Sequence, residues 1–145
     1  MELVRSMLLV AEDENLIQQV SNQFSKHNYS VVIENSKIKS ILKMLQQNID
    51  LIMIDIDVTV NLNLDLIDII RRTRPRLPIV VLSSDGTIDT LRKYIQAGVF
   101  YCALKPLDAD EIVKLLEAVS HVNKLRGKMR DSFYDHYETK KLMYG

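Results

Sequence analysis

The stretch "DLIMIDID", residues 50–57, sets four apolar side chains in a row and places two carboxylates directly behind them. Residues 51–54 have the length and the uninterrupted apolar character of a strand that is buried on both faces. A carboxylate drawn into such an interior costs several kcal/mol unless another group pairs with it. The sequence therefore predicts that Asp55 lies at the solvent-reaching end of a strand, next to a group of opposite charge.

Apolar runs of the same kind recur along the chain and alternate with segments of helical spacing. The other strand candidates are Met7–Ala11, Val31–Ile33, Ile79–Leu82 and Val99–Leu104. The apolar stripes of the predicted helices are formed by Leu16, Val20 and Phe24, by Ile38, Ile41, Leu42 and Leu45, by Leu66, Ile67 and Ile70, by Ile88, Leu91 and Ile95, and by Ile112, Leu115, Leu116 and Val119. This order predicts an α/β fold of the (βα)5 type, with a single doubly wound, five-stranded parallel sheet covered by helices on both faces.

Residues that begin and end helices agree with this order. Ser36 and Asp108 are predicted N-caps, and Glu111 follows Asp108 at the spacing of a capping box. Gly98 is predicted to end the fourth helix, because glycine adopts the left-handed conformation that closes many helices.

The bulk properties are those of one ordinary globular domain. A length of 145 residues, with 47% hydrophobic and 26% charged residues, suffices for one sizeable core. Cys102 is the only cysteine, which excludes a disulfide framework and a cysteine-based metal cluster. A formal net charge of zero argues against nucleic-acid binding, and no apolar run approaches a membrane span. We therefore expect a cytoplasmic domain with no direct nucleic-acid binding and no membrane association.

Polar side chains follow the strand candidates and are expected to meet, since all strands of a parallel sheet end at the same edge. They are Glu12, Asp13 and Glu14 after the first strand, Asp55 and Asp57 after the third, Ser83–Asp85 after the fourth, and Lys105 after the fifth. Carboxylates suit Mg²⁺, and a lysine and a hydroxyl can hold phosphoryl oxygens. An aspartate can itself accept a phosphoryl group. The set predicts phosphoryl-transfer chemistry.

These motifs resemble those of the response-regulator receiver domain of two-component signalling, whose simplest form is the stand-alone chemotaxis type. The resemblance covers residues 5–121 and rests on "LLVAEDE" (8–14), "DLIMID" (50–55), "IVVLSS" (79–84), Gly98 and "LKP" (104–106). It implies a flavodoxin-like fold with strand order 2-1-3-4-5 and a cis peptide bond between Lys105 and Pro106.

The resemblance also implies a role for each residue at the predicted edge. These roles are phosphoacceptor for Asp55, direct Mg²⁺ ligand for Asp13, water-mediated ligand for Glu12, backbone-carbonyl ligand for Asp57, phosphoryl-sensing hydroxyl for Ser83 and phosphoryl-binding cation for Lys105. The implied function is a switch that accepts a phosphoryl group from a sensor histidine kinase in a Mg²⁺-dependent reaction and then changes its interaction face. It implies no enzyme activity beyond self-catalysed phosphoryl acceptance and autodephosphorylation.

Two departures from the family pattern concern the loops of the predicted site. Thr59 and Asn63 stand where the family usually has proline and glycine. Asparagine tolerates the left-handed backbone conformation that glycine would supply, so we expect the loop still to turn, and we expect Thr59 to loosen it. Asp57 and Asp85 add acidic side chains two residues beyond Asp55 and Ser83, and are expected to make the mouth of the site more negative.

A third departure is Cys102, which replaces the usual aromatic switch residue, while Tyr101 is expected to face the opposite side of the sheet. This leaves open an alternative function, that of a pseudo-receiver acting as a phosphorylation-independent protein-interaction module. A flavodoxin-like cofactor or nucleotide binder is disfavoured. The acidic residues 12–14 would repel phosphate, and no glycine-rich loop follows the first strand.

Residues 1–121 form the predicted receiver domain, and residues 122–145 carry an excess of Lys and Arg over Asp and Glu. In that segment, apolar side chains at i, i+4 spacing are Leu125, Met129, Phe133 and Tyr137. Two interpretations stay open: a helical extension that serves as linker or partner-binding helix, and a frayed basic tail. The expected partners are a sensor histidine kinase or phosphotransfer protein, a downstream protein or output domain, and a second copy of the chain.

Overall fold

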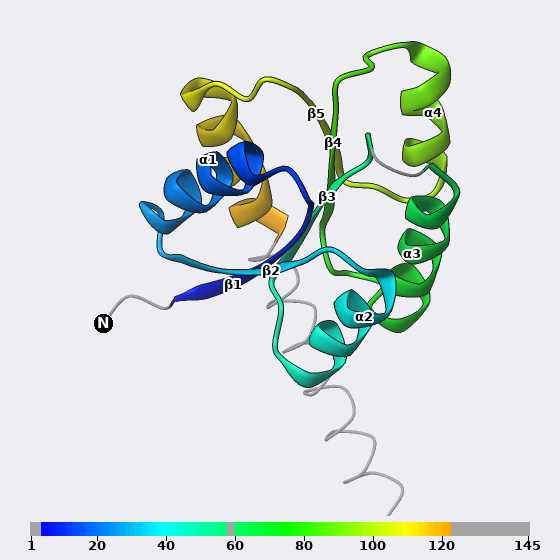
Figure 1. Ribbon diagram of the computed structural model, residues 1–145, viewed down its shortest axis with the longest axis horizontal. Helices are drawn as coiled ribbons and strands as arrows, with labels where there is room; N and C mark the ends of the chain where they lie inside the picture. The colour runs from blue at the N-terminus through cyan, green and yellow to red at the C-terminus, as the bar shows by residue number, and fades with distance from the viewer. Residues whose placement is uncertain (1–3, 58–59, 123–145) are drawn as a thin grey trace, which may run out of the picture.

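Figure 1 shows the computed structural model of the protein, which describes residues 4–57 and 60–122, with the backbone alone at 60–62. The elements are β1 (Arg5–Val10), α1 (Glu14–Ser25), β2 (Tyr29–Glu34), α2 (Lys37–Gln46), β3 (Leu51–Asp55), α3 (Val60–Thr73), β4 (Ile79–Ser83), α4 (Ile88–Gln96) and β5 (Tyr101–Leu104). Residues 109–122 are helical and are called the C-terminal helix here. The predictions for Thr59 and for residues 123–145 lie outside the described residues.

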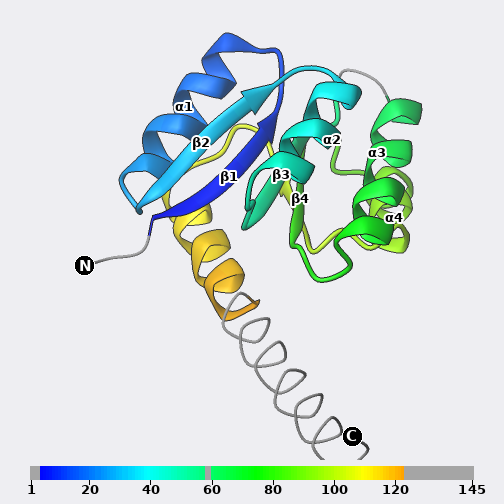
Figure 2. The same ribbon diagram turned by 90° about the horizontal axis from the view of Figure 1, so that it is seen from below.

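The strands form one parallel, five-stranded sheet in the order β2-β1-β3-β4-β5. The helix α1 and the C-terminal helix cover one face of the sheet, and α2, α3 and α4 cover the other (Figures 1 and 2). Because every strand runs in the same direction, all carboxyl ends lie at one edge. The predicted fold class and strand order are confirmed.

Strand side chains alternate between two cores, one on each face of the sheet. Met7, Leu9 and their neighbours pack with α1 and the C-terminal helix. Leu8 and Ile52 belong to the core beneath α2, α3 and α4. Both central strands, β3 and β4, are buried along their whole length. Asp55, the last residue of β3, is therefore held at the sheet edge by a strand packed on both sides.

Helix ends follow the predicted boundary residues. The Ser36 hydroxyl accepts a hydrogen bond from Lys39 N–H (3.0 Å), and the Asp108 carboxylate accepts one from Glu111 N–H (2.7 Å). Gly98 follows α4 with φ of +96°, and a Cβ at this position would lie 3.0 Å from a side-chain carbon of α3. Glycine is therefore favoured there by the backbone conformation, and a larger residue would also have to displace the Arg71 side chain.

Three helices bury the stripes that the sequence predicts. The buried side chains are Leu16, Val20 and Phe24 of α1, Leu66, Ile67 and Ile70 of α3, and Ile112, Leu115 and Val119 of the C-terminal helix. Within the described residues, no helix combines the length and the apolar character that crossing a membrane requires.

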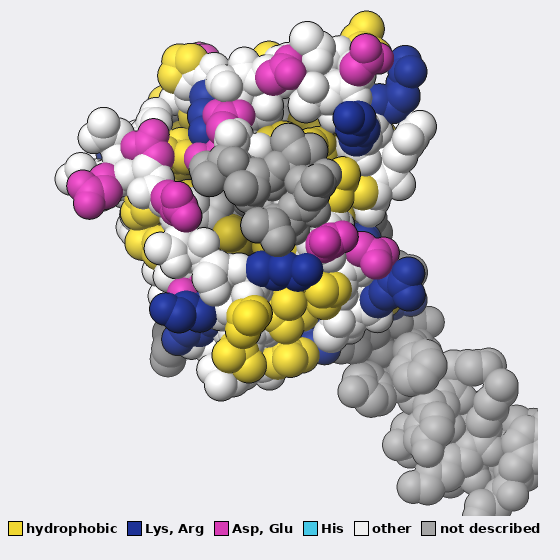
Figure 3. Space-filling view, turned by 45° about the vertical axis from the view of Figure 1, so that its right-hand side comes forward, with side chains coloured by type: hydrophobic (Ala, Val, Ile, Leu, Met, Phe, Trp, Pro, Cys, Tyr) yellow, Lys and Arg dark blue, Asp and Glu magenta, His cyan; other side chains and the backbone are white. Residues whose placement is uncertain are grey.

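The helix α2 buries a different face from the predicted one. Of the predicted stripe, Ile38, Leu42 and Leu45 are 71%, 48% and 54% exposed. Exposed hydrophobic side chains of this kind gather in a patch at the lower centre of Figure 3. Ser40 and Met44 are buried instead, and Ile41 is partly buried. Ser40 tolerates the interior because its hydroxyl donates to the Ser36 carbonyl (2.7 Å) within the helix. The predicted core face of α2 is wrong apart from Ile41.

The segment from α4 to β5 also differs from the prediction. Of the predicted α4 stripe, Ile88 and Ile95 are exposed and Leu91 is partly buried. The buried side chain of α4 is Tyr94, whose ring takes the inward position. The strand β5 is shorter than the apolar run, because its pairing with β4 begins at Tyr101 and residues 99–100 belong to the connection that follows α4.

Candidate functional site

The pairing register places the ends of neighbouring strands side by side. β1 ends beside β3 at the Val10–Ile54 pair, and β4 ends beside β5 at the Ser83–Leu104 pair. Asp55 continues β3 by one residue, opposite β4. The residues that follow each strand therefore emerge at the same edge, as predicted from the sequence.

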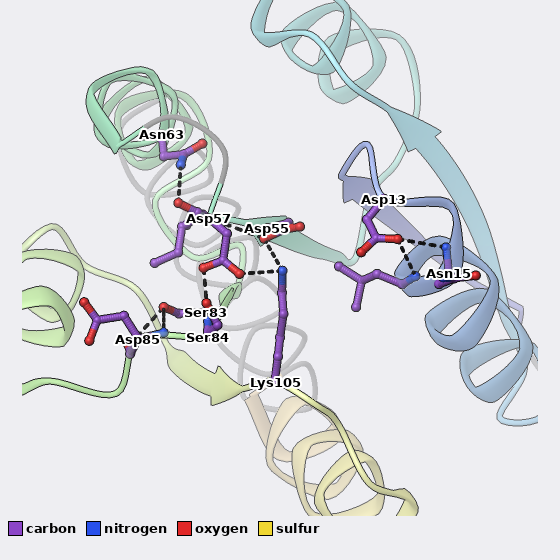
Figure 4. Close-up of polar contacts among 11 residues, drawn as sticks. Asp13, Asn15, Asp55, Asp57, Asn63, Ser83, Ser84, Asp85 and Lys105 are labelled. Atoms are coloured by element: carbon purple, nitrogen blue, oxygen red, sulfur yellow. Dashed lines mark hydrogen bonds and ion pairs between the residues drawn. The ribbon is translucent and has the colours of Figure 1, made fainter.

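Asp55 and Lys105 form an ion pair at the centre of this edge (Figure 4). The Lys105 Nζ donates a hydrogen bond to Asp55 Oδ1 over 2.6 Å. The Asp55 side chain is 2% exposed and that of Lys105 is 18% exposed. Water screens this charge-assisted hydrogen bond far less than it screens a surface ion pair. The cationic partner that the buried position of Asp55 demands is therefore Lys105.

The Asp57 carboxylate binds two donors at the same edge. Lys105 Nζ donates to its Oδ2 (2.8 Å), and the backbone N–H of Ser84 donates to its Oδ1 (3.0 Å). The N–H of Asp57 itself donates to Asp55 Oδ1 (3.1 Å). An ammonium and a backbone amide thus converge on one carboxylate and form a small anion-binding site. The role of the Ser84 amide was not predicted, since only its position directly after β4 pointed to it.

Lys105 and Asp57 stabilise each other's charged forms. Partial burial by itself would raise the pKa of Asp57, but hydrogen bonds from Lys105 and Ser84 outweigh it and lower that pKa. Burial by itself would lower the pKa of Lys105, but hydrogen bonds to Asp55 and Asp57 outweigh it and raise that pKa. At neutral pH, Lys105 is therefore protonated and Asp57 is ionised.

Ser83 and Asp85 form a separate set of contacts after β4. The buried Ser83 hydroxyl donates to the Asp85 carbonyl (3.0 Å) and accepts from the Asp85 N–H (3.0 Å). The Asp85 carboxylate accepts from Thr87 N–H (2.8 Å) and from the Thr90 hydroxyl (2.8 Å), which lowers its pKa. The two acids predicted at the mouth of the site therefore have different surroundings: Asp57 lies in it, whereas Asp85 is engaged with α4.

Asp13 lies at the end of β1 but is directed toward α1. Its Oδ1 accepts hydrogen bonds from Asn15 N–H (2.9 Å) and Leu16 N–H (3.4 Å), so that it acts as the N-cap of α1. Figure 4 shows this carboxylate apart from the contacts that join Asp55, Asp57 and Lys105. The structure brings Asp55 and Lys105 into contact as predicted, and places Asp13 at the neighbouring strand end.

Glu12 lines an open hollow at the ends of β1 and β2, together with Glu14, Glu34 and Asn35. Within residues 4–57 and 60–122, no three acidic, histidine or cysteine side chains make a ready-formed metal centre. Mg²⁺ usually takes one or two protein carboxylates and keeps several waters, so it needs no such cluster. Carboxylates at neighbouring strand ends, those of Asp13 and Asp55, fit this cation in their donor chemistry.

The residues around Lys105 on β5 lie as predicted. The peptide bond between Lys105 and Pro106 is cis. Tyr101 packs against the core under α1, whereas Cys102 packs against the opposite core. Burial raises the pKa of the Cys102 thiol, which makes it a poor nucleophile at neutral pH.

Asn63 connects α3 to the end of β3. Among the described residues other than glycine, Asn28 is the one with positive φ, so Asn63 does not use the left-handed conformation that asparagine tolerates. Asn63 instead lies inside α3, where its side-chain amide donates to the Ile56 carbonyl (3.3 Å). Asn63 therefore reaches the end of β3 through its side-chain amide, from within a helical backbone.

Tyr94 supplies an aromatic ring to the core in which Cys102 lies. The residue is 1% exposed, and within the described part of the chain its hydroxyl has no hydrogen-bond partner. Burial raises the pKa of Tyr94, while the neighbouring Asn63 amide opposes that rise. Sequence analysis gave Tyr94 no role, because the isoleucines of α4 formed a more regular stripe.

Comparison with known proteins agrees with this geometry. A family model for the response regulator receiver domain matches residues 8–117. The DNA-binding transcriptional regulator NtrC of Rhizobium meliloti (strain 1021) is 28% identical over 130 residues, which cover 88% of this chain and 27% of the relative. The transcriptional regulatory protein GlrR of Escherichia coli (strain K12) is 25% identical over 111 residues, which cover 77% and 25%. The chain spans about a quarter of the length of these relatives.

Solved structures share the fold. NtrX from Brucella abortus in complex with ADP superimposes with a TM-score of 0.78 at 23% identity, over 89% of this chain and 29% of that one. A response regulator from Thermotoga maritima gives a TM-score of 0.75 at 23% identity, over 81% and 98%. Identities this low bear on the fold alone, whereas the family model matches most of the sequence. The chain therefore belongs to the family of response regulator receiver domains of two-component signalling.

Proposed function

We propose that this domain is a phosphorylation switch in which Asp55 accepts a phosphoryl group in a Mg²⁺-dependent reaction and the interaction face changes as a result. The observation that carries the proposal is a buried carboxylate at the sheet edge with an ammonium group 2.6 Å away. Family membership supports the same chemistry. The domain would act in the cytoplasm, with no enzyme activity beyond its own phosphoryl acceptance and autodephosphorylation.

The proposed reaction forms an aspartyl phosphate. A carboxylate oxygen of Asp55 attacks the phosphorus, the bond from phosphorus to the phosphohistidine nitrogen breaks, and its electron pair stays on the imidazole. The N–H of Asp57, which already donates to Asp55 Oδ1, holds the nucleophile in place. Lys105 balances the negative charge of the transferred group, and the Ser84 N–H offers it a hydrogen bond.

The proposed ligands of Mg²⁺ are Glu12, Asp13, Asp55 and the backbone carbonyl of Asp57. The cation supplies positive charge that offsets the repulsion between carboxylates and phosphoryl oxygens. Both hydrogen bonds that cap α1 go to Asp13 Oδ1, so capping leaves its second oxygen for a cation or a bound water. Asp13 can thus serve helix and metal together.

Ser83 links the proposed site to α4. Its hydroxyl now exchanges two hydrogen bonds with the Asp85 backbone, and the Asp85 carboxylate binds the first turn of α4. When Ser83 turns to a phosphoryl oxygen, the Asp85 backbone loses these bonds. A change at Asp55 would reach α4 by this route, without an aromatic side chain at position 102.

The proposed donor is a sensor histidine kinase or a phosphotransfer protein. Two relatives are described as transcriptional regulators, and this chain spans about a quarter of their length. These descriptions support an output domain or a separate downstream protein as the target of the switch.

The test is intact-mass measurement after incubation with acetyl phosphate, with and without Mg²⁺. We expect a mass gain of one phosphoryl group on the wild-type protein only when Mg²⁺ is present, and none on Asp55→Asn, which keeps the shape but removes the nucleophile. An equal gain on Asp55→Asn would assign the phosphoryl group to another residue, and no gain on the wild type would contradict the proposal.

A second function, the phosphorylation-independent interaction module, is favoured by one observation. The two donors that would hold a phosphoryl group, Lys105 Nζ and Ser84 N–H, already bind the Asp57 carboxylate. A module of this kind would bind neither Mg²⁺ nor a phosphoryl group. Calorimetric titration with Mg²⁺ beside the mass measurement separates the two functions.

A further inference from the structure

We infer that the Asp57 side chain is a built-in competitor of the phosphoryl group, occupying Lys105 and the Ser84 amide until phosphorylation displaces it. The inference rests on the proposed function, because it names a residue that regulates the same site. Figure 4 shows the contact: the Asp57 carboxylate lies between the Lys105 ammonium and the Ser84 backbone.

The competition follows from the positions of the donors. Lys105 Nζ lies 2.6 Å from Asp55 Oδ1 and 2.8 Å from Asp57 Oδ2. A phosphoryl group bonded to Asp55 would carry its oxygens into the region that Lys105 reaches. The Ser84 N–H, which closes the other side of this region, donates to Asp57 Oδ1 over 3.0 Å. A carboxylate and a phosphoryl group both require such donors, so the two anions exclude each other.

The exposure of the two aspartates shows which one can leave. The Asp55 side chain is 2% exposed and is fixed at the end of a buried strand. The Asp57 side chain is 30% exposed and stands on the loop that follows. Asp57 can therefore rotate into water, where its charge is solvated, while Asp55 stays in place. The contact is a reversible obstacle rather than a permanent block.

Asp85 provides a matched control for the charge of Asp57. Each aspartate stands two residues beyond the last residue of its strand, Asp55 in β3 and Ser83 in β4. The Asp85 carboxylate binds Thr87 and Thr90 instead of Lys105. Removing it takes away the same charge near the sheet edge and leaves the anion-binding site intact.

The experiment compares rates of phosphoryl uptake from acetyl phosphate with Mg²⁺, followed by intact mass. Asp57→Ala is expected to accelerate uptake about tenfold, since the phosphoryl group no longer displaces a charge-assisted hydrogen bond. Asp85→Ala is expected to stay within about twofold of the wild type. The acceleration should persist at about 1 M salt, where charges are screened beyond about 3 Å. Asp57→Asn, which keeps the shape of the side chain, serves if the alanine variant folds poorly.

Two other outcomes of this experiment would overturn the inference, and a third would overturn the proposed function instead. Equal rates for Asp57→Ala and wild type, or a slower variant, would show that Asp57 does not compete. Equal acceleration by Asp57→Ala and Asp85→Ala that vanishes in salt would assign the effect to the general negative field. If no variant gains mass, the proposed function fails, and a separate binding measurement then decides the inference.

That binding measurement uses inorganic phosphate alone and follows the Ser84 amide by NMR. Asp57→Ala leaves Lys105 Nζ and the Ser84 N–H without the carboxylate that binds them. We therefore expect phosphate to shift the Ser84 amide resonance at concentrations about tenfold lower than for the wild type. The Asp85→Ala protein should titrate like the wild type. Identical titrations of wild type and Asp57→Ala would overturn the inference without reference to phosphoryl transfer.

Discussion

The loops after β3 and β4 carry the same sequence feature, an aspartate two residues beyond the strand end, and use it differently. The Asp57 carboxylate, after β3, accepts hydrogen bonds from Lys105 and from the Ser84 backbone, so it lies within the candidate site. The Asp85 carboxylate, after β4, accepts hydrogen bonds from Thr87 and Thr90, so it is bound to the first turn of α4. The two carboxylates stand at the same distance from their strands, so their different surroundings come from the hydrogen-bond donors near each one.

The two loops hold different parts of the molecule. The loop after β3 holds charged groups against one another, through Asp57 and Lys105. The loop after β4 holds the first turn of α4, through the Asp85 carboxylate. Ser83 exchanges hydrogen bonds with the Asp85 backbone and so links the end of β4 to the second loop.

The largest effect is expected from removing the cation that the β3 loop shares. Lys105→Ala leaves Asp55 buried with its charge uncompensated and Asp57 beside it. We expect the free energy of unfolding at pH 7 to fall by about 2 kcal/mol in urea denaturation. The control, Lys93→Ala on the exposed side of α4, should change it by less than about 0.5 kcal/mol. An unchanged value for Lys105→Ala would mean that solvent already screens this pair.

Carboxyl titrations by ¹³C NMR should report the different surroundings of Asp57 and Asp85. Asp57 and Asp85 should both titrate below the ordinary value of 3.8. In Lys105→Ala the midpoint of Asp57 should rise, because burial is then opposed by fewer hydrogen bonds, while that of Asp85 should stay in place. If both midpoints rose, the overall electrostatic field, and not the local hydrogen-bond donors, would set the two pKa values.

The lowered pKa of Asp57 also fixes the sign of its pH dependence. The ionised form is favoured by folding, so its stabilisation is fully present above the unfolded pKa of about 3.9 and is lost as pH falls through the folded pKa. Relative to Asp57→Asn, the wild type should therefore lose free energy of unfolding as the pH is lowered below about 4. A difference that is constant across this range in urea denaturation would contradict the assignment.

Amide hydrogen exchange should separate the two loops by position. Asp85→Ala removes the acceptor of the Thr87 N–H, so exchange should quicken at Thr87 and leave Ser84 unaffected. Asp57→Ala should do the reverse, because Ser84 loses its acceptor. Faster exchange at both amides in either variant would show that the loops respond together.

The smallest effect concerns Tyr94, the buried residue of α4. Its buried hydroxyl has no hydrogen-bond partner within the described residues. Tyr94→Phe removes a polar atom from the core, and we expect thermal unfolding to show a gain of less than about 1 kcal/mol. A loss of stability would indicate that the neighbouring Asn63 amide bonds to the hydroxyl in solution.

The fold was predictable because β3 and β4 are apolar up to their last residue and alternate with helical segments. The meeting of Asp55 with Lys105 followed from the same fact, since parallel strands end at one edge. The faces of α2 and α4 were not predictable from apolar spacing. Ser40 satisfies its own hydroxyl within its helix, and one Tyr94 ring takes the place of two isoleucines.

The contacts of Asp57 were also beyond sequence reasoning. Its carboxylate finds the Ser84 amide, which belongs to another loop and leaves no mark in the residue type, since every residue but proline has an N–H. Asp13 presents the same difficulty, because an N-cap and a metal ligand call for the same side chain. The types of the side chains therefore predicted where the site lies. The backbone N–H groups that bind each carboxylate could not be predicted, because the sequence does not mark them.

Asp55 is proposed to receive the phosphoryl group at a site that the Asp57 carboxylate fills beforehand. A crystal structure of the protein treated with beryllofluoride and Mg²⁺ tests this proposal most directly, because beryllofluoride imitates a phosphoryl group without a covalent reaction. We predict beryllofluoride on an Asp55 oxygen, in contact with Lys105 and the Ser84 N–H, with the Asp57 carboxylate turned into solvent. An adduct that leaves Asp57 bound to both donors, or an Asp55 that takes up no beryllofluoride, would contradict the account.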